Sequence, residues 1–150
     1  MIQRREFIAG LTGAAAWPLA AHAQPGGRVR RISVLTPLDE NDPLAKSFLS
    51  ALTQALAALG WIEGRNVRME HRFAGGDINL MRGLARELVG LQPDIILAIS
   101  TAATAAVQRE TRTIPIVFMN VGDPVASGTV ARLDRPSGNV TERRRPDGAK

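Results

Sequence analysis

The stretch Pro93–Thr104, with the sequence PDIILAISTAAT, places the strongest constraint on the fold of this chain. A proline opens it, and the apolar residues Ile95–Ile99 then run without alternation. Such a run is typical of a strand buried on both faces of a parallel sheet. Open α/β folds bind their ligands at the carboxyl ends of such strands. Ser100 and Thr101 follow at that point, where they either cap the next helix or contact a ligand.

The first 23 residues are typical of an export signal. Arg4 and Arg5 precede Ile8–Ala21, which contains no charged residue, and a small-x-small cleavage sequence ends before Gln24. The paired arginines, followed by an aromatic and an aliphatic residue, resemble a twin-arginine signal. We therefore predict cleavage after Ala23 and a periplasmic location, without stable membrane insertion after cleavage. The alternative, an amphipathic first helix of the domain, would need a polar face that this segment lacks.

Composition narrows the chemistry that the chain can perform. There is no cysteine, and His71 is the only histidine outside the predicted signal. A histidine-based metal site or catalytic triad is therefore not expected. The 19 basic and 14 acidic residues give a net charge of +5, but the basic residues are scattered and aromatic residues are few. This pattern does not indicate nucleic acid binding. We expect no catalytic residues, no metal and no cofactor.

Strand and helix patterns alternate along the rest of the chain. The predicted strands are Arg31–Thr36, Val67–Arg72, Asp94–Ile99 and Ile116–Met119, and the predicted helices are Pro43–Leu59, Ile78–Leu91 and Ala102–Arg109. The helical crossovers are long enough to join parallel strands, so the order predicts a doubly wound parallel α/β sheet. The sequence has no Gly-rich dinucleotide loop, Walker motif or Gly-x-Ser-x-Gly elbow.

Trp61 lies between the first predicted helix and the second predicted strand. A tryptophan directly after a helix-ending glycine usually packs down as a local anchor, and this is the role that we predict. Stacking against a ligand is the alternative.

Several segments resemble one family of bacterial transport proteins. They are RREFI, RRISVLTPL, LGWIEGRNV, LQPDIILAIS, TRTIPIVFMNVGDPVASG and ARLDRPSGNVT. Together they resemble the substrate-binding proteins of ABC importers, in the group associated with tryptophan and tyrosine transport. The resemblance covers residues 4–141. It implies a type I periplasmic binding fold, with a small-molecule ligand between two α/β lobes and an ABC permease in the inner membrane as partner.

The resemblance also sets the expected domain organisation. Family members are longer, so we expect only the first lobe, at residues 31–141, after a signal peptide at 1–23 and a linker at 24–30. The tail at 142–150 lacks hydrophobic periodicity and is expected to be disordered, as in a truncation or frameshift product. Two alternatives remain. A ligand-sensing regulator domain of the same fold would need a helix-turn-helix where the export signal lies, and the other alternative is an exported α/β enzyme.

The predicted ligand site lies in the loops after three parallel strands, which share one edge of the sheet. Its residues are Thr36, Pro37, Ser100, Thr101, Thr104, Val121, Gly122 and Asp123. Their use as a ligand cleft is what the resemblance implies. Ser100, Thr101 and the free N–H groups of the next helix are expected to hold the carboxylate of an amino acid or a related zwitterion. Asp123 is expected either to pair with a ligand ammonium or only to cap the turn that follows it.

Overall fold

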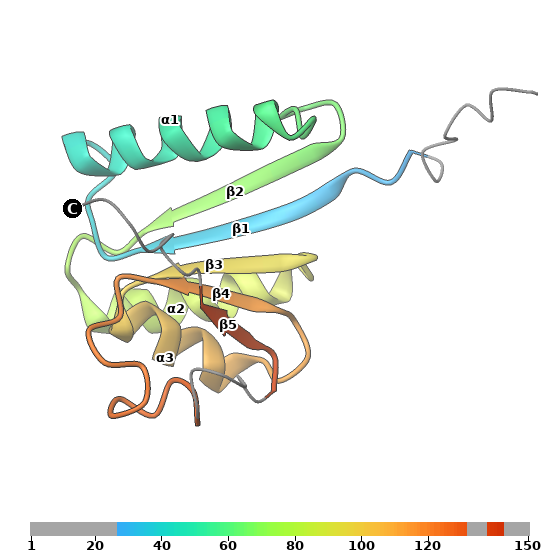
Figure 1. Ribbon diagram of the computed structural model, residues 1–150. Helices are drawn as coiled ribbons and strands as arrows, with labels where there is room; N and C mark the ends of the chain where they lie inside the picture. The colour runs from blue at the N-terminus through green and yellow to red at the C-terminus, as the bar shows by residue number, and fades with distance from the viewer. Residues whose placement is uncertain (1–26, 132–137, 143–150) are drawn as a thin grey trace, which may run out of the picture.

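The apolar runs of the sequence become the strands of a parallel sheet. The computed structural model describes residues 27–131 and 138–142. The strands are β1 (Arg30–Thr36), β2 (Val67–Phe73), β3 (Ile95–Ile99), β4 (Ile116–Met119) and β5 (Val140–Glu142). Their order across the sheet is β2-β1-β3-β4-β5, and every neighbouring pair is parallel (Figure 1). The predicted parallel α/β fold is therefore confirmed.

Three helices connect the first four strands and cover both faces of the sheet. They are α1 (Pro43–Ala58), α2 (Ile78–Gly90) and α3 (Thr101–Glu110). Helix α1 lies on one face, whereas α2 and α3 lie on the other (Figure 1). From β1 the chain moves outward to β2, and it then returns to β3 and continues in the opposite direction. The carboxyl ends of β1 and β3 are thus the point where the strand order reverses, which is where open α/β sheets bind ligands.

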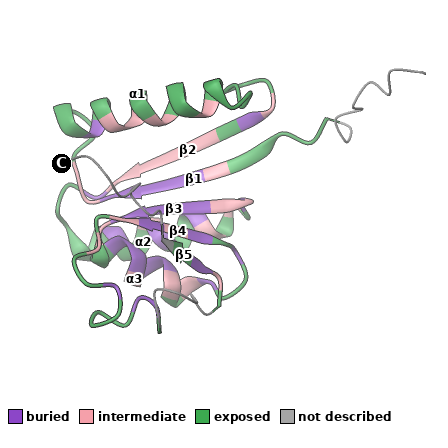
Figure 2. Ribbon diagram, in the orientation of Figure 1, coloured by how far each residue is buried: buried purple, intermediate pink, exposed green. Residues whose placement is uncertain are grey.

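The two faces of the sheet carry unequal cores (Figure 2). The larger core lies under α2 and α3, and its fully buried large side chains are Leu35, Leu88, Ile96, Val107, Ile116 and Phe118. On the other face, Val34, Leu97 and Ile99 are covered by half-buried side chains of α1, including Phe48 and Leu52. Helix α1 buries only Ala45 fully, so it is packed on the sheet less completely than α2 and α3.

The predicted elements are all present, with bounds that differ by at most one residue at either end. Two features differ from the prediction. Trp61 packs only partly, because 39% of its surface remains exposed. Strand β5 was not predicted, and it includes Glu142, the first residue of the predicted tail. The predicted signal and residues 143–150 of the tail lie outside the described residues. Within the described part of the chain, we find no helix with the length and apolar character needed to cross a membrane.

Candidate functional site

The carboxyl ends of β1, β3 and β4 bring the predicted site loops to one edge of the sheet. The N–H of Ser100, directly after β3, donates to the carbonyl of Met119 at the end of β4 (2.9 Å). The N–H of Ala74, directly after β2, donates to the carbonyl of Thr36 at the end of β1 (3.0 Å). The first bond joins the loop after β3 to the end of β4, and the second joins the turn after β2 to the end of β1. Backbone hydrogen bonds therefore continue past the ends of the strands at this edge.

Ser100 has the most unusual backbone at this edge. Its φ is +110° and its ψ is 161°, a region that side-chain-bearing residues rarely occupy. Two hydrogen bonds maintain this backbone conformation. The Ser100 Oγ accepts from the Ala103 N–H (3.2 Å), and the Ser100 carbonyl accepts from the Thr104 hydroxyl (2.7 Å). Backbone strain of this kind is concentrated at binding and catalytic sites, where the surrounding contacts maintain it.

The start of α3 differs in charge from the starts of the other two helices. Helices α1 and α2 are capped by the carboxylates of Asp42 and Asp77, whereas α3 is capped by the neutral hydroxyl of Ser100. The first residue of α3, Thr101, is exposed. The partial positive charge at a helix start attracts anions, and at α3 no acidic side chain of the cap or the first turn offsets it. This end of α3 can therefore accept a ligand carboxylate.

The loop after β1 is fastened to the turn after β2. The Gly76 N–H donates to the Pro37 carbonyl (2.7 Å), and the Gly75 N–H donates to the Leu38 carbonyl (3.2 Å). Both glycines have positive φ values, which a glycine adopts without strain. Sequence reasoning left this Gly-Gly turn out of the site. The sequence does contain a signal for it, because the turn directly follows a predicted parallel strand and must therefore lie at the same edge of the sheet.

The loop after β4 gives Asp123 a structural role. Its Oδ1 accepts from the N–H groups of Val125 (3.1 Å) and Ala126 (2.9 Å), so it caps the following turn. Both bonds use Oδ1, and the side chain is exposed. Gly122 beside it is exposed, and Val121 packs against the larger core. Of the two predicted roles for Asp123, capping is therefore present, and Oδ2 takes no part in it.

The predicted site residues fall into two groups by burial. Six of them are at least partly accessible at the edge: Pro37, Ser100, Thr101, Val121, Gly122 and Asp123. Thr36 and Thr104 are buried, and their hydroxyl groups bond to the backbone of Leu38 and of Ser100. These two threonines support the loops from below and do not present a polar group at the surface.

Two hollows lie outside this group of residues. One, of about 160 Å³, runs between α2 and α3, with Met81, Arg82, Ala105 and Arg109 among its lining residues. The other, of about 480 Å³, lies beside β5 and the segment Gly128–Ala131. Neither is lined by a predicted site residue.

The groups with shifted pKa values also lie away from the candidate edge. At the amino end of the sheet, the backbone N–H of Arg31 and the guanidinium groups of Arg28 and Arg30 lower the pKa of Asp94. On β2, burial is the main reason that the pKa of His71 is lowered. Among the described residues, no three His, Cys, Asp or Glu side chains gather as metal ligands would.

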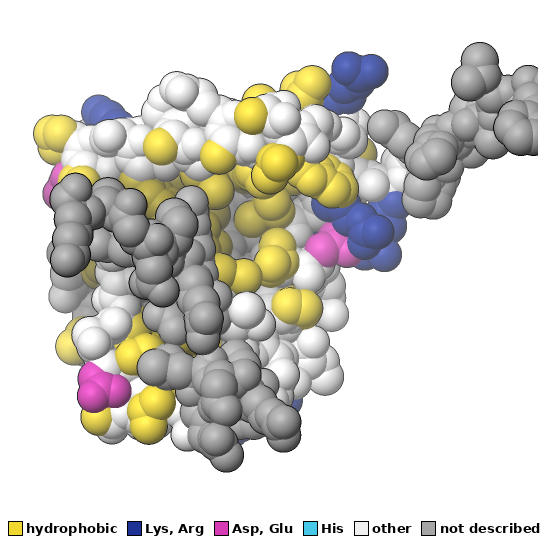
Figure 3. All heavy atoms as spheres, viewed as in Figure 1, with side chains coloured by type: hydrophobic (Ala, Val, Ile, Leu, Met, Phe, Trp, Pro, Cys, Tyr) yellow, Lys and Arg dark blue, Asp and Glu magenta, His cyan; other side chains and the backbone are white. Residues whose placement is uncertain are grey.

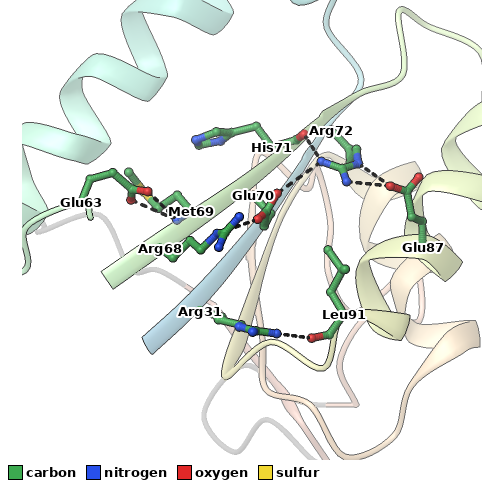
Figure 4. A network of polar contacts seen from close by, with 9 residues as sticks. All are labelled: Arg31, Glu63, Arg68, Met69, Glu70, His71, Arg72, Glu87 and Leu91. Atoms are coloured by element: carbon green, nitrogen blue, oxygen red, sulfur yellow. Dashed lines mark hydrogen bonds and ion pairs between the residues drawn. The ribbon is translucent and has the colours of Figure 1, made fainter. Parts of the chain in front are cut away.

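Figure 4 shows charged side chains along the outer strand β2. Arg72 lies between Glu70 (3.7 Å) and Glu87 (2.6 Å), and the Glu63 carboxylate accepts from the Met69 N–H (3.0 Å). Charged groups of this kind protect an edge strand from pairing with another chain. This network therefore has a structural explanation that requires no ligand.

Comparison with known proteins relates the described fold to one family. The profile of the family "ABC transporter substrate binding protein" matches residues 31–143. A "Tyrosine-binding protein" of Clostridioides difficile (strain R20291) is 34% identical over 110 residues, which make up 73% of this chain and 31% of that protein. The chain thus spans about a third of the length of this curated relative.

Solved structures extend the similarity to three dimensions. The crystal structure of a conserved domain protein from Vibrio cholerae has a TM-score of 0.71 and 32% identity, over 77% of this chain and 38% of that one. An ABC domain from Streptococcus pneumonia, solved in complex with L-Trp, has a TM-score of 0.69 and 24% identity, over 76% of this chain and 38% of that one. At that identity the second likeness concerns the fold alone.

Proposed function

Because this chain belongs to the family of ABC transporter substrate-binding proteins, we propose that it contributes the first lobe of a binding site for a small solute. The family consists of binding proteins and not of enzymes, in agreement with the sequence prediction. The observation that carries ligand capture is the start of α3, where a strained Ser100 leaves the helix dipole without an acidic cap. The chain covers 38% of the solved relative, so the activity of the family-length protein is part of this proposal.

The ligand that fits this edge is an amino acid. The free N–H groups at the start of α3, together with the hydroxyl groups of Ser100 and Thr101, would bind its carboxylate. The Asp123 Oδ2, which takes no part in capping, would face its ammonium. Since a curated relative that is 34% identical over 110 residues is named as a tyrosine-binding protein, L-tyrosine is the first ligand to test.

The cellular setting belongs to the same proposal. Export by the twin-arginine route would place the domain in the periplasm, and an ABC permease in the inner membrane would receive the ligand. The arginine pair at positions 4 and 5 and the apolar run after it support this, together with family membership.

Calorimetry with ligand analogues tests the assigned roles. We expect L-tyrosine to bind more tightly than tyramine, which lacks the carboxylate, and than 3-(4-hydroxyphenyl)propionate, which lacks the ammonium. Ser100→Ala should weaken L-tyrosine binding, and Asp123→Asn should reduce the preference for L-tyrosine over the propionate. Loss of one charge-assisted hydrogen bond should cost about 1.5–3 kcal/mol.

A matched control is Ser47→Ala, at an exposed serine in the second turn of α1 to which no ligand contact is assigned, and it should bind like the parent chain. The assignment of these residues is wrong if both site variants remain folded and bind L-tyrosine as tightly as this control.

A further inference from the structure

The amino end of the sheet, opposite the candidate site, combines exposed apolar and basic side chains. We call this surface the amino-end patch. It contains the apolar residues Val29 (40% exposed), Leu59 (76%), Trp61 (39%) and Ile62 (43%), and the exposed arginines Arg28, Arg30 and Arg65. Figure 3 shows hydrophobic and basic side chains together at the end of the molecule where α1 finishes and β1 begins. Exposed large apolar side chains that gather at one place indicate an interaction surface.

Asn66 fixes the loop that presents the patch. Its Nδ2 donates to the Gly60 carbonyl (2.8 Å), and its Oδ1 accepts from the Ile62 N–H (2.7 Å). Its own carbonyl accepts from the Arg30 N–H (3.0 Å), which joins the loop to the start of β1. The backbone N–H of Trp61 donates to the Leu56 carbonyl (2.8 Å). These hydrogen bonds fix the backbone of the loop that carries the exposed Trp61 and Ile62, and they join it to the start of β1.

The charges at this end favour an anionic partner. Asp94 is already paired with Arg28 (3.0 Å) and Arg30 (3.1 Å), and the Glu63 carboxylate is engaged by the Met69 N–H. Arg65 makes no ion pair with any described residue. The three arginines of the patch outnumber these two carboxylates, so this end of the sheet keeps a net positive charge that attracts negatively charged groups.

We propose that the amino-end patch docks this domain on a bilayer surface that contains anionic phospholipid. Tryptophan and aliphatic side chains enter the boundary between headgroups and acyl chains, and neighbouring arginines bind lipid phosphates. Before the predicted cleavage after Ala23, the apolar run Ile8–Ala21 is connected to the domain at Gly27, beside this patch. Docking in this orientation points the carboxyl edge of the sheet, with the candidate site, away from the bilayer. The inference is independent of the ligand proposed above.

Trp61 supplies a reporter at the patch itself. The chain has two tryptophans, Trp17 and Trp61, so Trp17→Phe in the full chain leaves Trp61 as the only one. With vesicles of phosphatidylcholine and phosphatidylglycerol, its emission should shift to shorter wavelength and be quenched by brominated lipid. Vesicles of phosphatidylcholine alone should give neither change. Arg28→Gln with Arg65→Gln should weaken partitioning on the order of tenfold or more, and high salt should do the same.

Leu44 provides the matched control at the opposite end of α1, where it is 65% exposed. In the full chain with Trp17→Phe, Trp61→Phe and Leu44→Trp, the emission should be unchanged by either vesicle. An emission shift of the tryptophan at position 44 as well as of Trp61 would mean non-specific adsorption. An equal Trp61 shift on neutral vesicles would mean that anionic phospholipid is not required. Sedimentation with vesicles while Trp61 remains in water would mean attachment through residues 8–21 alone. Each of these three results would overturn the proposal.

Discussion

At the scale of single residues, Ser100 combines two opposing effects on stability. Its hydroxyl caps α3, which stabilises the helix start, whereas its positive φ strains a residue that carries a side chain. Ser100→Ala removes the cap and keeps the strain, so it should lower the free energy of unfolding by about 1 kcal/mol. Ser100→Gly also removes the cap but relieves the strain, so it should be the more stable variant of the two. Urea unfolding measures both, and a glycine variant no more stable than the alanine variant would show that the backbone at this position is unstrained.

His71 makes stability depend on pH. It lies on β2 opposite Val34, on the face covered by α1, and its Nδ1 is buried without a partner among the described residues. Burial is the largest effect and lowers its pKa below the ordinary value of 6.5; Glu63 and Glu70 raise the pKa, and Arg72 lowers it. The folded state therefore prefers neutral His71. The resulting stability is full above pH 6.5 and is lost as the pH falls below it.

The variant His71→Gln separates this contribution from the other titrating groups. Chemical unfolding at neutral and at mildly acidic pH should show a larger loss of stability in the parent chain than in the variant. Equal losses in the two chains would assign the pH dependence to other groups.

At the scale of elements, β5 shows what the sequence could not predict. The strand has three residues, too few for a hydrophobic period, and the described residues between β4 and β5 form no helix. A tertiary contact explains why the strand forms, because Val140 pairs with Ile116 of β4 and is buried in the larger core. The seven longer elements, by contrast, carried period and capping signals such as Asp42, Asp77 and Ser100, and their bounds could be predicted.

Val140→Ala tests whether β5 contributes to the core. Loss of two buried methyl groups should lower the free energy of unfolding by about 1.5–3 kcal/mol. Val125→Ala, at an exposed valine, is the matched control and should change stability by no more than about 0.5 kcal/mol. Equal effects of the two substitutions in thermal or urea unfolding would mean that β5 does not pack as described.

The candidate site follows the same division between local signals and tertiary contact. Strand order predicted which loops share an edge, because parallel strands end on the same side. It did not predict that the hydroxyl groups of Thr36 and Thr104 bond to the backbone below the surface. It also left open the role of Asp123, because capping and ligand contact require the same residue type at the same position.

At the scale of the whole molecule, the two ends of the sheet differ in chemistry. The carboxyl edge carries the capping acids Asp42, Asp77 and Asp123 and the neutral start of α3. The amino edge carries the arginines around Asp94 and the exposed apolar side chains of the amino-end patch. This polarity suits a domain that captures a zwitterion at one end and faces a membrane with the other. The match over 38% of the solved relative is consistent with one lobe of a two-lobed clamp.

The most direct test of the central claim is to map L-tyrosine binding on backbone amide resonances. We predict that titration shifts the amide signals of residues 100–104 first, followed by those of residues 36, 38, 122 and 123. Signals at the start of β1 and in the loop 60–66 should stay unchanged. Ligand-dependent shifts confined to the groove between α2 and α3 or to the hollow beside β5, with the start of α3 unaffected, would contradict the account.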